Sequence, residues 1–172
     1  MAVNRKSNIV LVGMPGAGKS TVGILLAKLV SKGFADTDVL IQVSQGRSLQ
    51  DIVDRDGYLA LRKIEEVVLL GLSCTDCVIA TGGSAIYSEG AMQHLKRDGV
   101  VVFLDADIGT LCSRIHDYET RGLAKRPEQS FQELFAERRI LYERYADVIV
   151  KCDGLSHEEV CATITAQLKS IG

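Results

Sequence analysis

A glycine-rich loop that joins an apolar run to a helical pattern carries the clearest chemistry in this sequence. The apolar run Ile9–Val12 leads into Gly13-Met14-Pro15-Gly16-Ala17-Gly18-Lys19-Ser20-Thr21, which has the G-x-x-x-x-G-K-S spacing of a phosphate-binding loop. The glycines let successive backbone N–H groups surround one anion, and the helix that begins near Lys19 adds the positive end of its dipole. Lys19 can reach the β- and γ-phosphates, and the Ser20 hydroxyl can bind Mg²⁺. The sequence therefore predicts a nucleoside triphosphate site formed by Gly13, Gly16, Ala17, Gly18, Lys19, Ser20 and Thr21.

Two carboxylates follow the second apolar run, in the stretch Phe34-Ala35-Asp36-Thr37-Asp38. Open α/β sheets bind their ligands at the carboxyl ends of the strands. If the strand continues through this stretch, Asp36 and Asp38 point to the same side and into one cleft. One of them could then contribute to a metal site or accept a proton from a hydroxyl group, and the other could accept hydrogen bonds from a polyol. The alternative is an acidic turn that caps the next helix, because Asp is a common N-cap residue.

An arginine and a pair of glycines further along the chain have the residue types expected of a binding site for an acidic substrate. Arg62 lies three and four positions before Glu65 and Glu66 on a predicted helix, so a carboxylate could hold its guanidinium in place. A guanidinium held in this way could clamp a substrate carboxylate with two hydrogen bonds, and a plain surface ion pair is the alternative. Gly82 and Gly83 follow the third apolar run and allow backbone N–H groups to approach a ligand closely.

Apolar runs and helical patterns alternate along the chain, as is typical of an α/β protein. Buried strands are predicted at Ile9–Val12, Phe34–Ala35, Cys77–Ala80, Val100–Leu104 and Val148–Val150. Helices are predicted at Ser20–Val30, Leu49–Val53, Tyr58–Leu72, Ala91–Leu95, Ile108–His116, Phe131–Tyr145 and His157–Lys169. Ser48 and Ser130 each precede an acidic residue by three positions, which is the pattern of a capping box. The alternation predicts one domain over residues 1–172, with a parallel sheet covered by helices on both faces.

The polar segment Asp117–Gln129 interrupts this alternation. It contains Gly122, Pro127 and three cations, and its apolar residues follow no sustained period. Because loops of this length in compact domains are usually functional, the sequence predicts a lid at about residues 117–130, with a solvated connection as the alternative. We expect the lid to be mobile without ligands, since it lacks the periodic apolar residues that would dock it permanently.

Five motifs, in their order and at their separations, resemble those of shikimate kinase: G-x-x-G-x-G-K-S-T, D-T-D, L-R-x-x-E, A-T-G-G and E-R-x-x-L-Y-x-x-x-A-D. They extend from about Asn8 to about Val150. The resemblance implies a three-layer P-loop NTPase fold of the nucleoside-monophosphate-kinase type. In that fold the five parallel strands have the order 2-3-1-4-5, and substrate-binding helices are expected at about residues 38–72. The resemblance also implies an ATP-dependent kinase that uses Mg²⁺ and converts shikimate to shikimate 3-phosphate, a step in aromatic amino acid synthesis.

The resemblance assigns roles on the substrate side by position. Asp38 matches the residue that binds the ring hydroxyls and is placed to act as the base. Arg62 and Arg138 match the pair that grips the shikimate carboxylate. Gly82 and Gly83 match the backbone floor of that pocket.

On the nucleotide side, Asp36 matches the carboxylate near Mg²⁺, with Ser20 as the other metal ligand. Arg114 matches an arginine that contacts the nucleotide. Arg121 matches the lid arginine that closes over the phosphates and, with Lys19 and Asp38, belongs to the catalytic set. Arg126 remains a rival for the lid position, because the R-P pair of the family's lid occurs here only at Arg126-Pro127.

Three departures from the family's usual motifs leave the substrate open at this point. Ser84 stands where a third glycine is usual, and its side chain would narrow or re-polarise the pocket floor. The lid reads Arg121-Gly122-Leu123-Ala124 rather than R-P-L-L, and Arg138-Arg139-Ile140-Leu141-Tyr142 lacks the usual proline. Two alternatives therefore stand beside the shikimate kinase prediction. One is a kinase of the same fold for another hydroxylated acid such as gluconate, and the other is a nucleotide-binding module without turnover.

The composition of the chain excludes several other classes of function. The net charge of −2 and the absence of a Lys/Arg block argue against a nucleic-acid partner. No apolar run is long enough to span a membrane, and no apolar signal core follows Met1–Lys6. The five cysteines, including the C-x-x-C pair Cys74 and Cys77, form neither a disulfide framework nor an evident metal site. We therefore expect a cytoplasmic protein with small-molecule substrates, and a monomer.

Overall fold

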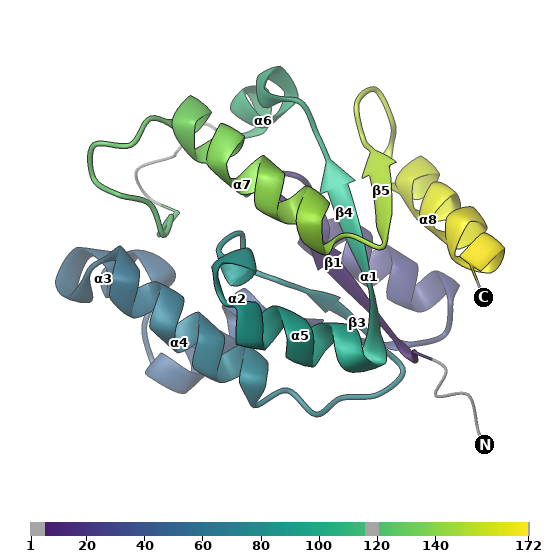
Figure 1. Cartoon of the computed structure of the whole chain (residues 1–172), viewed down its shortest axis with the longest axis horizontal. Coiled ribbons are helices and arrows are strands. Elements are labelled where there is room, and N and C mark those ends of the chain that lie inside the picture. Colours follow the sequence, from purple (N-terminus) through teal and green to yellow (C-terminus); the bar gives the residue numbers. More distant parts are fainter. Residues whose placement is uncertain (1–5, 116–120, 172) are drawn as a thin grey trace.

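A sheet of parallel strands forms the centre of the molecule (Figure 1). The computed structural model describes residues 6–115 and 121–171. Within these residues the sheet has five strands in the order β2-β3-β1-β4-β5, and every neighbouring pair is parallel. The strands are β1 (Asn8–Val12), β2 (Gly33–Asp36), β3 (Cys77–Ala80), β4 (Gly99–Asp105) and β5 (Val148–Lys151). The predicted fold class and strand order are thus confirmed, and each strand differs from its predicted range by at most one residue at either end.

The central strand β1 is buried along its whole length and fixes the register of its neighbours. Val10 lies opposite Ile79 of β3 on one side and opposite Val101 of β4 on the other. Such continuous apolar runs are expected of strands that helices cover on both faces. Register in such a sheet is fixed by packing, because a shift of one residue exchanges the faces to which all side chains point.

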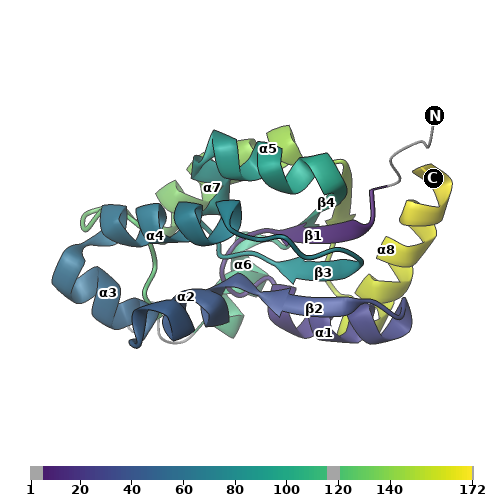
Figure 2. The same cartoon turned by 90° about the horizontal axis from the view of Figure 1, so that it is seen from below.

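Helices cover both faces of the sheet, as predicted (Figures 1 and 2). On one face α1 (Lys19–Leu29) packs against α8 (His157–Ile171), and on the other α5 (Glu89–Asp98) and α7 (Phe131–Tyr145) pack against β4. The short helix α6 (Ile108–Arg114) follows β4. Ser130 forms the predicted capping box with Glu133 at the start of α7. These layers bury one large hydrophobic core around β1, β3 and β4.

Three helices, α2 (Thr37–Gln45), α3 (Leu49–Asp56) and α4 (Tyr58–Leu70), extend beyond the sheet (Figure 2). They have a small core of their own, in which Ile41, Ile52 and Leu61 pack with Ala124 from the segment before α7. Ser48 caps α3 through the predicted capping box with Asp51. The segment that contains Ala124 therefore joins this helical extension to the rest of the molecule.

The structure corrects two predicted boundaries that affect the site. Strand β2 ends at Asp36, and the chain turns at once into α2, a helix that the apolar pattern does not indicate although it lies within the range of about 38–72 where the family resemblance implies helices. The prediction that Asp36 and Asp38 share a strand face is therefore wrong, because only Asp36 belongs to the strand. Helix α6 ends at Arg114, and the predicted end of this helix at His116 lies outside the described residues, as do residues 117–120 of the predicted lid.

In the part of the chain that the structure describes, no helix is both long and apolar enough to cross a membrane. All five cysteines lie in this part and are free thiols. Three of them, Cys77, Cys152 and Cys161, are buried, and burial raises the pKa of each thiol. Buried thiols with a raised pKa are unreactive, which agrees with cysteines that take no part in redox or metal chemistry.

Candidate active site

The glycine-rich loop adopts the geometry of an anion site at the start of α1. Gly18 is the N-cap of this helix and has a left-handed backbone, with φ of +94°, which a side chain would strain. Lys19 is 8% exposed, and its Nζ donates to the carbonyl oxygens of Gly13 at 2.7 Å and Met14 at 2.9 Å. Burial lowers the pKa of Lys19 to about 8. The backbone of the loop therefore holds the Lys19 ammonium group inside the loop.

The residues of the loop divide into those that face a cavity and those that support it. Gly16, Gly18, Lys19, Ser20 and Thr21 line the cavity. Gly13 and Ala17 do not line it: Gly13 packs against the carbonyl oxygen of Leu104, 2.8 Å from where its Cβ would lie, and Ala17 is buried in the core. Their small size is needed for packing beneath the loop, whereas the lining residues can contact a ligand.

Ser20 and Asp36 are in direct contact at the edge of this loop. The Ser20 hydroxyl donates to Oδ2 of Asp36 at 2.5 Å, while Oδ1 of Asp36 accepts from the backbone N–H groups of Asp38 and Val39. Asp36 is thus the N-cap of α2 as well as the partner of Ser20. A hydroxyl and a carboxylate are the oxygen donors that Mg²⁺ prefers, and Mg²⁺ usually takes only one or two protein ligands besides phosphate and water. The donor set of Ser20 and Asp36 therefore fits this ion, although no cluster of three or more acidic, His or Cys side chains suited to a metal occurs in the described residues.

Asp38 lies in the first turn of α2 and points toward the pocket floor. A Cβ on Gly82 would lie 2.7 Å from Oδ1 of Asp38 and would collide with Oε1 of Glu65 from α4. Burial raises the pKa of Asp38, and the nearby Lys19 opposes this effect. A buried carboxylate with a raised pKa is a better proton acceptor than an exposed one, so the position suits a general base.

One cavity of about 560 Å³ connects these groups. Its wall contains, besides the loop residues, Asp38, Glu65, Gly82, Gly83, Ser84, Arg114, Arg121 and Arg138. Residues from seven separate parts of the chain thus meet at the carboxyl end of the sheet, where ligands bind in folds of this kind.

The floor of the cavity is fixed by hydrogen bonds to its two glycines. The N–H of Gly82 donates to Oγ1 of Thr37, and the hydroxyl of Tyr142 donates to the carbonyl oxygen of Gly83 at 2.6 Å. Gly83 has no room for a side chain, because a Cβ there would lie 2.7 Å from Nη1 of Arg138. The glycines are therefore required by the close approach of side chains that line the site.

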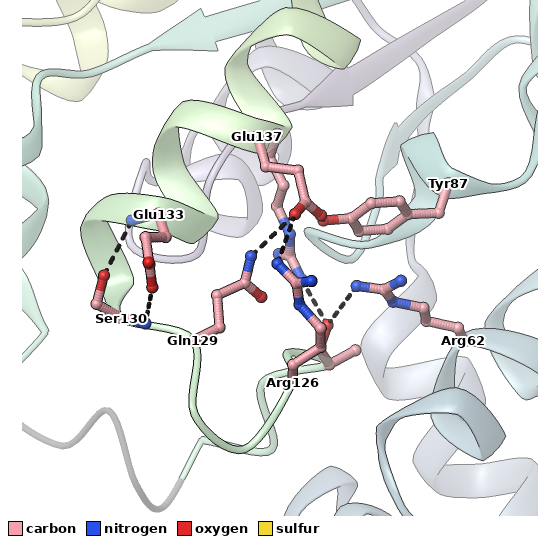
Figure 3. Close-up of polar contacts among 9 residues, drawn as sticks. Arg62, Tyr87, Arg126, Gln129, Ser130, Glu133 and Glu137 are labelled. Atoms are coloured by element: carbon pink, nitrogen blue, oxygen red, sulfur yellow. Dashed lines mark hydrogen bonds and ion pairs between the residues drawn. The ribbon is translucent and has the colours of Figure 1, made fainter.

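Arg62 and Arg138 meet at one backbone oxygen (Figure 3). Nη2 of Arg62 donates to the carbonyl oxygen of Ala124 at 3.1 Å, and Nη2 of Arg138 donates to the same oxygen at 3.0 Å. The guanidinium of Arg138 is buried at 1% exposure. Two guanidinium groups from different helices thus converge on one point that an oxygen atom occupies.

Aromatic rings, and not the predicted carboxylates, hold Arg62 in place. Its guanidinium carbon lies 3.6 Å from the centre of the Tyr87 ring and 5.1 Å from the centre of the Tyr58 ring. Glu65 instead accepts a hydrogen bond from Ser84, and Glu66 pairs with Lys63. The prediction that Glu65 or Glu66 positions Arg62 is therefore wrong. The wide apolar face of a ring beside a guanidinium supplies a cation–π contact in their place.

Glu137 accepts hydrogen bonds from several side chains beside the pair Arg62 and Arg138 (Figure 3). It accepts hydrogen bonds from the hydroxyl of Tyr87, from Nε2 of Gln129 and, at 3.4 Å, from Arg126. The hydrogen bond from Tyr87 holds the pKa of Glu137 below its usual range. Arg126 is thereby directed to Glu137, and it does not line the cavity.

Arg114 and Arg121 both line the cavity, and Arg114 lies beside the glycine-rich loop. Nη1 of Arg114 is 3.5 Å from the carbonyl oxygen of Gly16, and both arginines are exposed. The residue after Arg121 is tied to α3, because the N–H of Gly122 donates to Oε1 of Gln50 at 2.6 Å. The described part of the predicted lid is therefore docked in this structure by backbone hydrogen bonds and by Ala124, although it has no periodic apolar pattern.

Several residues of the site were not found from the sequence. Thr37 and Tyr142 fix the floor, Tyr87 holds Arg62, and the carbonyl oxygen of Ala124 accepts from both arginines. Thr37 lies inside the D-T-D motif and Tyr142 inside the E-R-x-x-L-Y motif, and these motifs are the one signal for them in the sequence. The contact of Tyr87 with Arg62 joins 3₁₀ helix η1 (Ala85–Tyr87) to α4, and no spacing in the sequence indicates it.

The chain matches known proteins along nearly its whole length. The family model described as shikimate kinase matches residues 15–169. A shikimate kinase of Gloeobacter violaceus is 40% identical over 168 residues, which cover 94% of this chain and 94% of that protein.

Solved structures agree with this match. The shikimate kinase from Acinetobacter baumannii in complex with shikimate is 32% identical, with a TM-score of 0.88 and coverage of 98% of this chain and 96% of that chain. The shikimate kinase from Aquifex aeolicus is 37% identical, with a TM-score of 0.81 and coverage of 94% and 96%. A gluconokinase from Sinorhizobium meliloti is 19% identical with a TM-score of 0.54 over 97% and 94%, and at that identity it shares the fold alone.

Proposed function

This chain belongs to the shikimate kinase family, and we propose that it transfers the γ-phosphoryl group of ATP to the 3-hydroxyl of shikimate. The observation that carries this proposal is the convergence of Arg62 and Arg138 on one oxygen beside the cavity that holds Lys19 and Asp38. A pair of guanidinium groups is suited to a carboxylate, and shikimate is a ring acid with three hydroxyl groups. The cavity thus supplies a site for each end of such an acceptor.

The glycine-rich loop binds the phosphates of ATP in this proposal. Backbone N–H groups at the start of α1 face the cavity, and Lys19 brings a positive charge to the β- and γ-phosphates. Ser20 and Asp36 would hold Mg²⁺, which would neutralise the charge that develops on the phosphates. Arg114 binds on the nucleotide side, and Arg121 adds a charge over the transferring group.

Asp38 acts on the acceptor. Its carboxylate accepts the proton of the hydroxyl that attacks the γ-phosphorus, and its buried position raises its pKa toward that task. Gly82 and Gly83 support the ring from below through their backbone, while Arg62 and Arg138 hold the carboxylate at the far end. Holding both ends of the acceptor limits its orientation, which is a large part of catalysis in phosphoryl transfer.

The remaining features of the proposal concern the whole protein. We infer that residues 1–172 act as one domain and that the lid covers about residues 117–130. We infer also that the enzyme works as a monomer in the cytoplasm, without a nucleic-acid or membrane partner. The five free thiols agree with a reducing compartment. Small-molecule kinases of this kind need no surface other than the cavity for their reaction.

An acceptor panel tests the proposal. ADP release is measured by a coupled assay with ATP and Mg²⁺ and with shikimate, quinate or gluconate as the acceptor. We expect release with shikimate at a kcat/KM at least about a hundredfold above that with gluconate, because the site is built for a ring acid. Release with gluconate alone would assign the chain to another acid, and release with no acceptor of the panel would leave only a nucleotide-binding module.

A further inference from the structure

Ser84 occupies the pocket floor and is engaged with a carboxylate. It is 7% exposed, and it follows Gly83 directly at the start of η1. Its hydroxyl donates to Oε2 of Glu65 in a short hydrogen bond. Ser84 makes no side-chain cap of η1, so this contact with α4 is the one that its hydroxyl makes among the described residues.

The other oxygen of Glu65, Oε1, is buried at the cavity wall and has no hydrogen-bond partner among the described residues. Glu65 as a whole is 2% exposed. This oxygen lies against Gly82, beside Oδ1 of Asp38, and Glu65, Gly82 and Asp38 all line the cavity. A buried polar atom is normally bonded, so an unbonded acceptor at the wall of a substrate cavity indicates a ligand donor.

The charges around Glu65 make its protonation sensitive to this serine. Burial raises the pKa of Glu65 to about 7, with the carboxylate of Asp38 from α2 acting in the same direction. The hydrogen bond from Ser84, Arg138 of α7 and Lys19 of α1 act in the opposite direction. A protonated carboxyl carries its proton on one oxygen, so only the ionised form offers both oxygens as acceptors. Loss of the Ser84 hydrogen bond would raise the pKa of Glu65 and so favour the protonated form near neutral pH.

We propose that Ser84 is a positioning residue for substrate recognition: its hydroxyl holds Oε2 of Glu65 and so fixes Oε1, beside Asp38, as an acceptor for a ring hydroxyl of the substrate. This inference rests on the proposed function for the identity of the acceptor. It assigns a purpose to the one position of the floor at which this chain departs from the usual three glycines. A glycine there could not make this contact, because the donor is the side-chain hydroxyl.

Kinetics of Ser84→Ala and Ser84→Gly test the inference. We expect either variant to raise the KM for shikimate about tenfold, because a hydrogen bond to a charged group is lost, while the KM for ATP and kcat change less than about twofold. The acid limb of kcat/KM for shikimate should move to higher pH, since the bond that favours ionised Glu65 is absent. In a Glu65→Gln background the further change Ser84→Ala should have no such effect. Ser170→Ala on α8, far from the cavity, is the control and should match the wild type.

Direct titration separates this inference from the proposed function. The Glu65 carboxyl is followed by NMR in the ligand-free protein, with Glu65→Gln to assign its signal, and its pKa should be higher in Ser84→Ala than in the wild type. An unchanged Glu65 titration overturns the inference whatever the acceptor is. Equal losses for both substrates with an unchanged pH profile also overturn it, since they would show that Ser84 only ties η1 to α4. Failure of the wild type to phosphorylate shikimate, with the Glu65 titration altered as expected, would refute the proposed function alone.

Discussion

Unbonded polar atoms distinguish the residues of this site from the rest of the interior. In the described part of the chain, four buried side-chain atoms lack a hydrogen-bond partner: Nε of Arg62, Oε1 of Glu65, Oε1 of Gln129 and Nε of Arg138. Three of the four belong to the cavity wall or to the arginine pair beside it, and the fourth belongs to Gln129, which donates to Glu137 next to that pair. Such atoms destabilise a fold unless a ligand completes their bonding, so their clustering supports a site built for a polar acceptor.

The substitution Asp38→Asn tests whether Asp38 is the general base. The amide has nearly the same shape but accepts no proton at neutral pH, and it presents donors where the hydroxyl proton points. We expect kcat to fall at least about a hundredfold, as for loss of a general base, while the Kd for ATP changes less than about threefold. Single-turnover kinetics and nucleotide titration measure the two effects. Full turnover at saturating acceptor would leave Asp38 as a first-turn residue of α2 with no part in the chemistry.

Arg62→Lys tests the carboxylate clamp. Lysine keeps the charge but has neither the planar pair of donors nor the flat face that rests on Tyr87. We expect the Kd for shikimate to rise about tenfold or more, or about 1.4 kcal/mol, with little change in the Kd for ATP. Arg47→Lys, at a surface pair with Asp56, is the matched control. Equal weakening of both ligands by Arg62→Lys would be incompatible with a clamp for the substrate alone.

At the scale of elements, the segment before α7 links the helical extension to the substrate site. The carbonyl oxygen of Ala124 takes hydrogen bonds from Arg62 and Arg138, and Gly122 is bonded to Gln50 of α3. A carboxylate bound by the two arginines would compete with this carbonyl oxygen. The position of the segment and the occupation of the substrate site are therefore coupled in our proposal.

The two arginines of this segment should differ in their effect on turnover. Arg121 lines the cavity, whereas Arg126 has a 62% exposed side chain and is paired with Glu137. We expect Arg121→Ala to lower kcat at least about tenfold, because a charge beside the transferring group is lost, and Arg126→Ala to lower it less than about threefold. The reverse ranking would show that Arg126 is the lid arginine.

Hydrogen exchange tests the lid itself. We expect peptides that cover residues 121–129 to become more protected when both shikimate and a non-hydrolysable ATP analogue are bound, because a closing lid buries its backbone. Peptides from β1 and β4, in the core, are the internal reference. Equal protection with and without ligands would contradict a lid.

The elements that could be predicted from the sequence are those whose pattern lies within a few neighbouring residues. All five strands follow from short apolar runs, and both serine capping boxes follow from a spacing of three residues. The apolar pattern did not indicate helix α2, which only the family resemblance implied, because it starts directly after β2 and its exposed Val39 and Val43 hide the pattern of an amphipathic helix. The support of Arg62 by Tyr87 could not be predicted, since it depends on how η1 packs against α4.

At the scale of the whole molecule, Glu65 links the site to folding stability. Its pKa is about 7 in the folded protein against a usual 4.5, so the folded state keeps this proton to higher pH than the unfolded state does. The associated stability is complete below about pH 4.5 and is lost as the pH rises through about 7. Lys19 titrates in a separate window, between about 8 and its usual 10.5.

Glu65→Gln should remove this dependence, because the amide does not titrate. We expect the wild type to lose on the order of 2 kcal/mol of unfolding free energy between pH 5 and 7.5, and the variant to lose less than half of that amount. Urea unfolding at several pH values within this window measures both. Glu66→Gln, which removes a surface carboxylate one residue away, is the control. Parallel curves for the wild type and Glu65→Gln would show that Glu65 titrates alike in both states.

Identification of the phosphorylated product tests the central claim most directly. The protein is incubated with ATP, Mg²⁺ and shikimate, and the products are quantified by ³¹P NMR and mass spectrometry. We expect shikimate 3-phosphate and ADP in equal amounts, and in Lys19→Ala a rate below about a tenth of the wild type, a barrier increase of more than about 1.4 kcal/mol, with an unchanged thermal midpoint. Release of ADP without phosphorylated shikimate, or undiminished product formation by Lys19→Ala, would contradict the account.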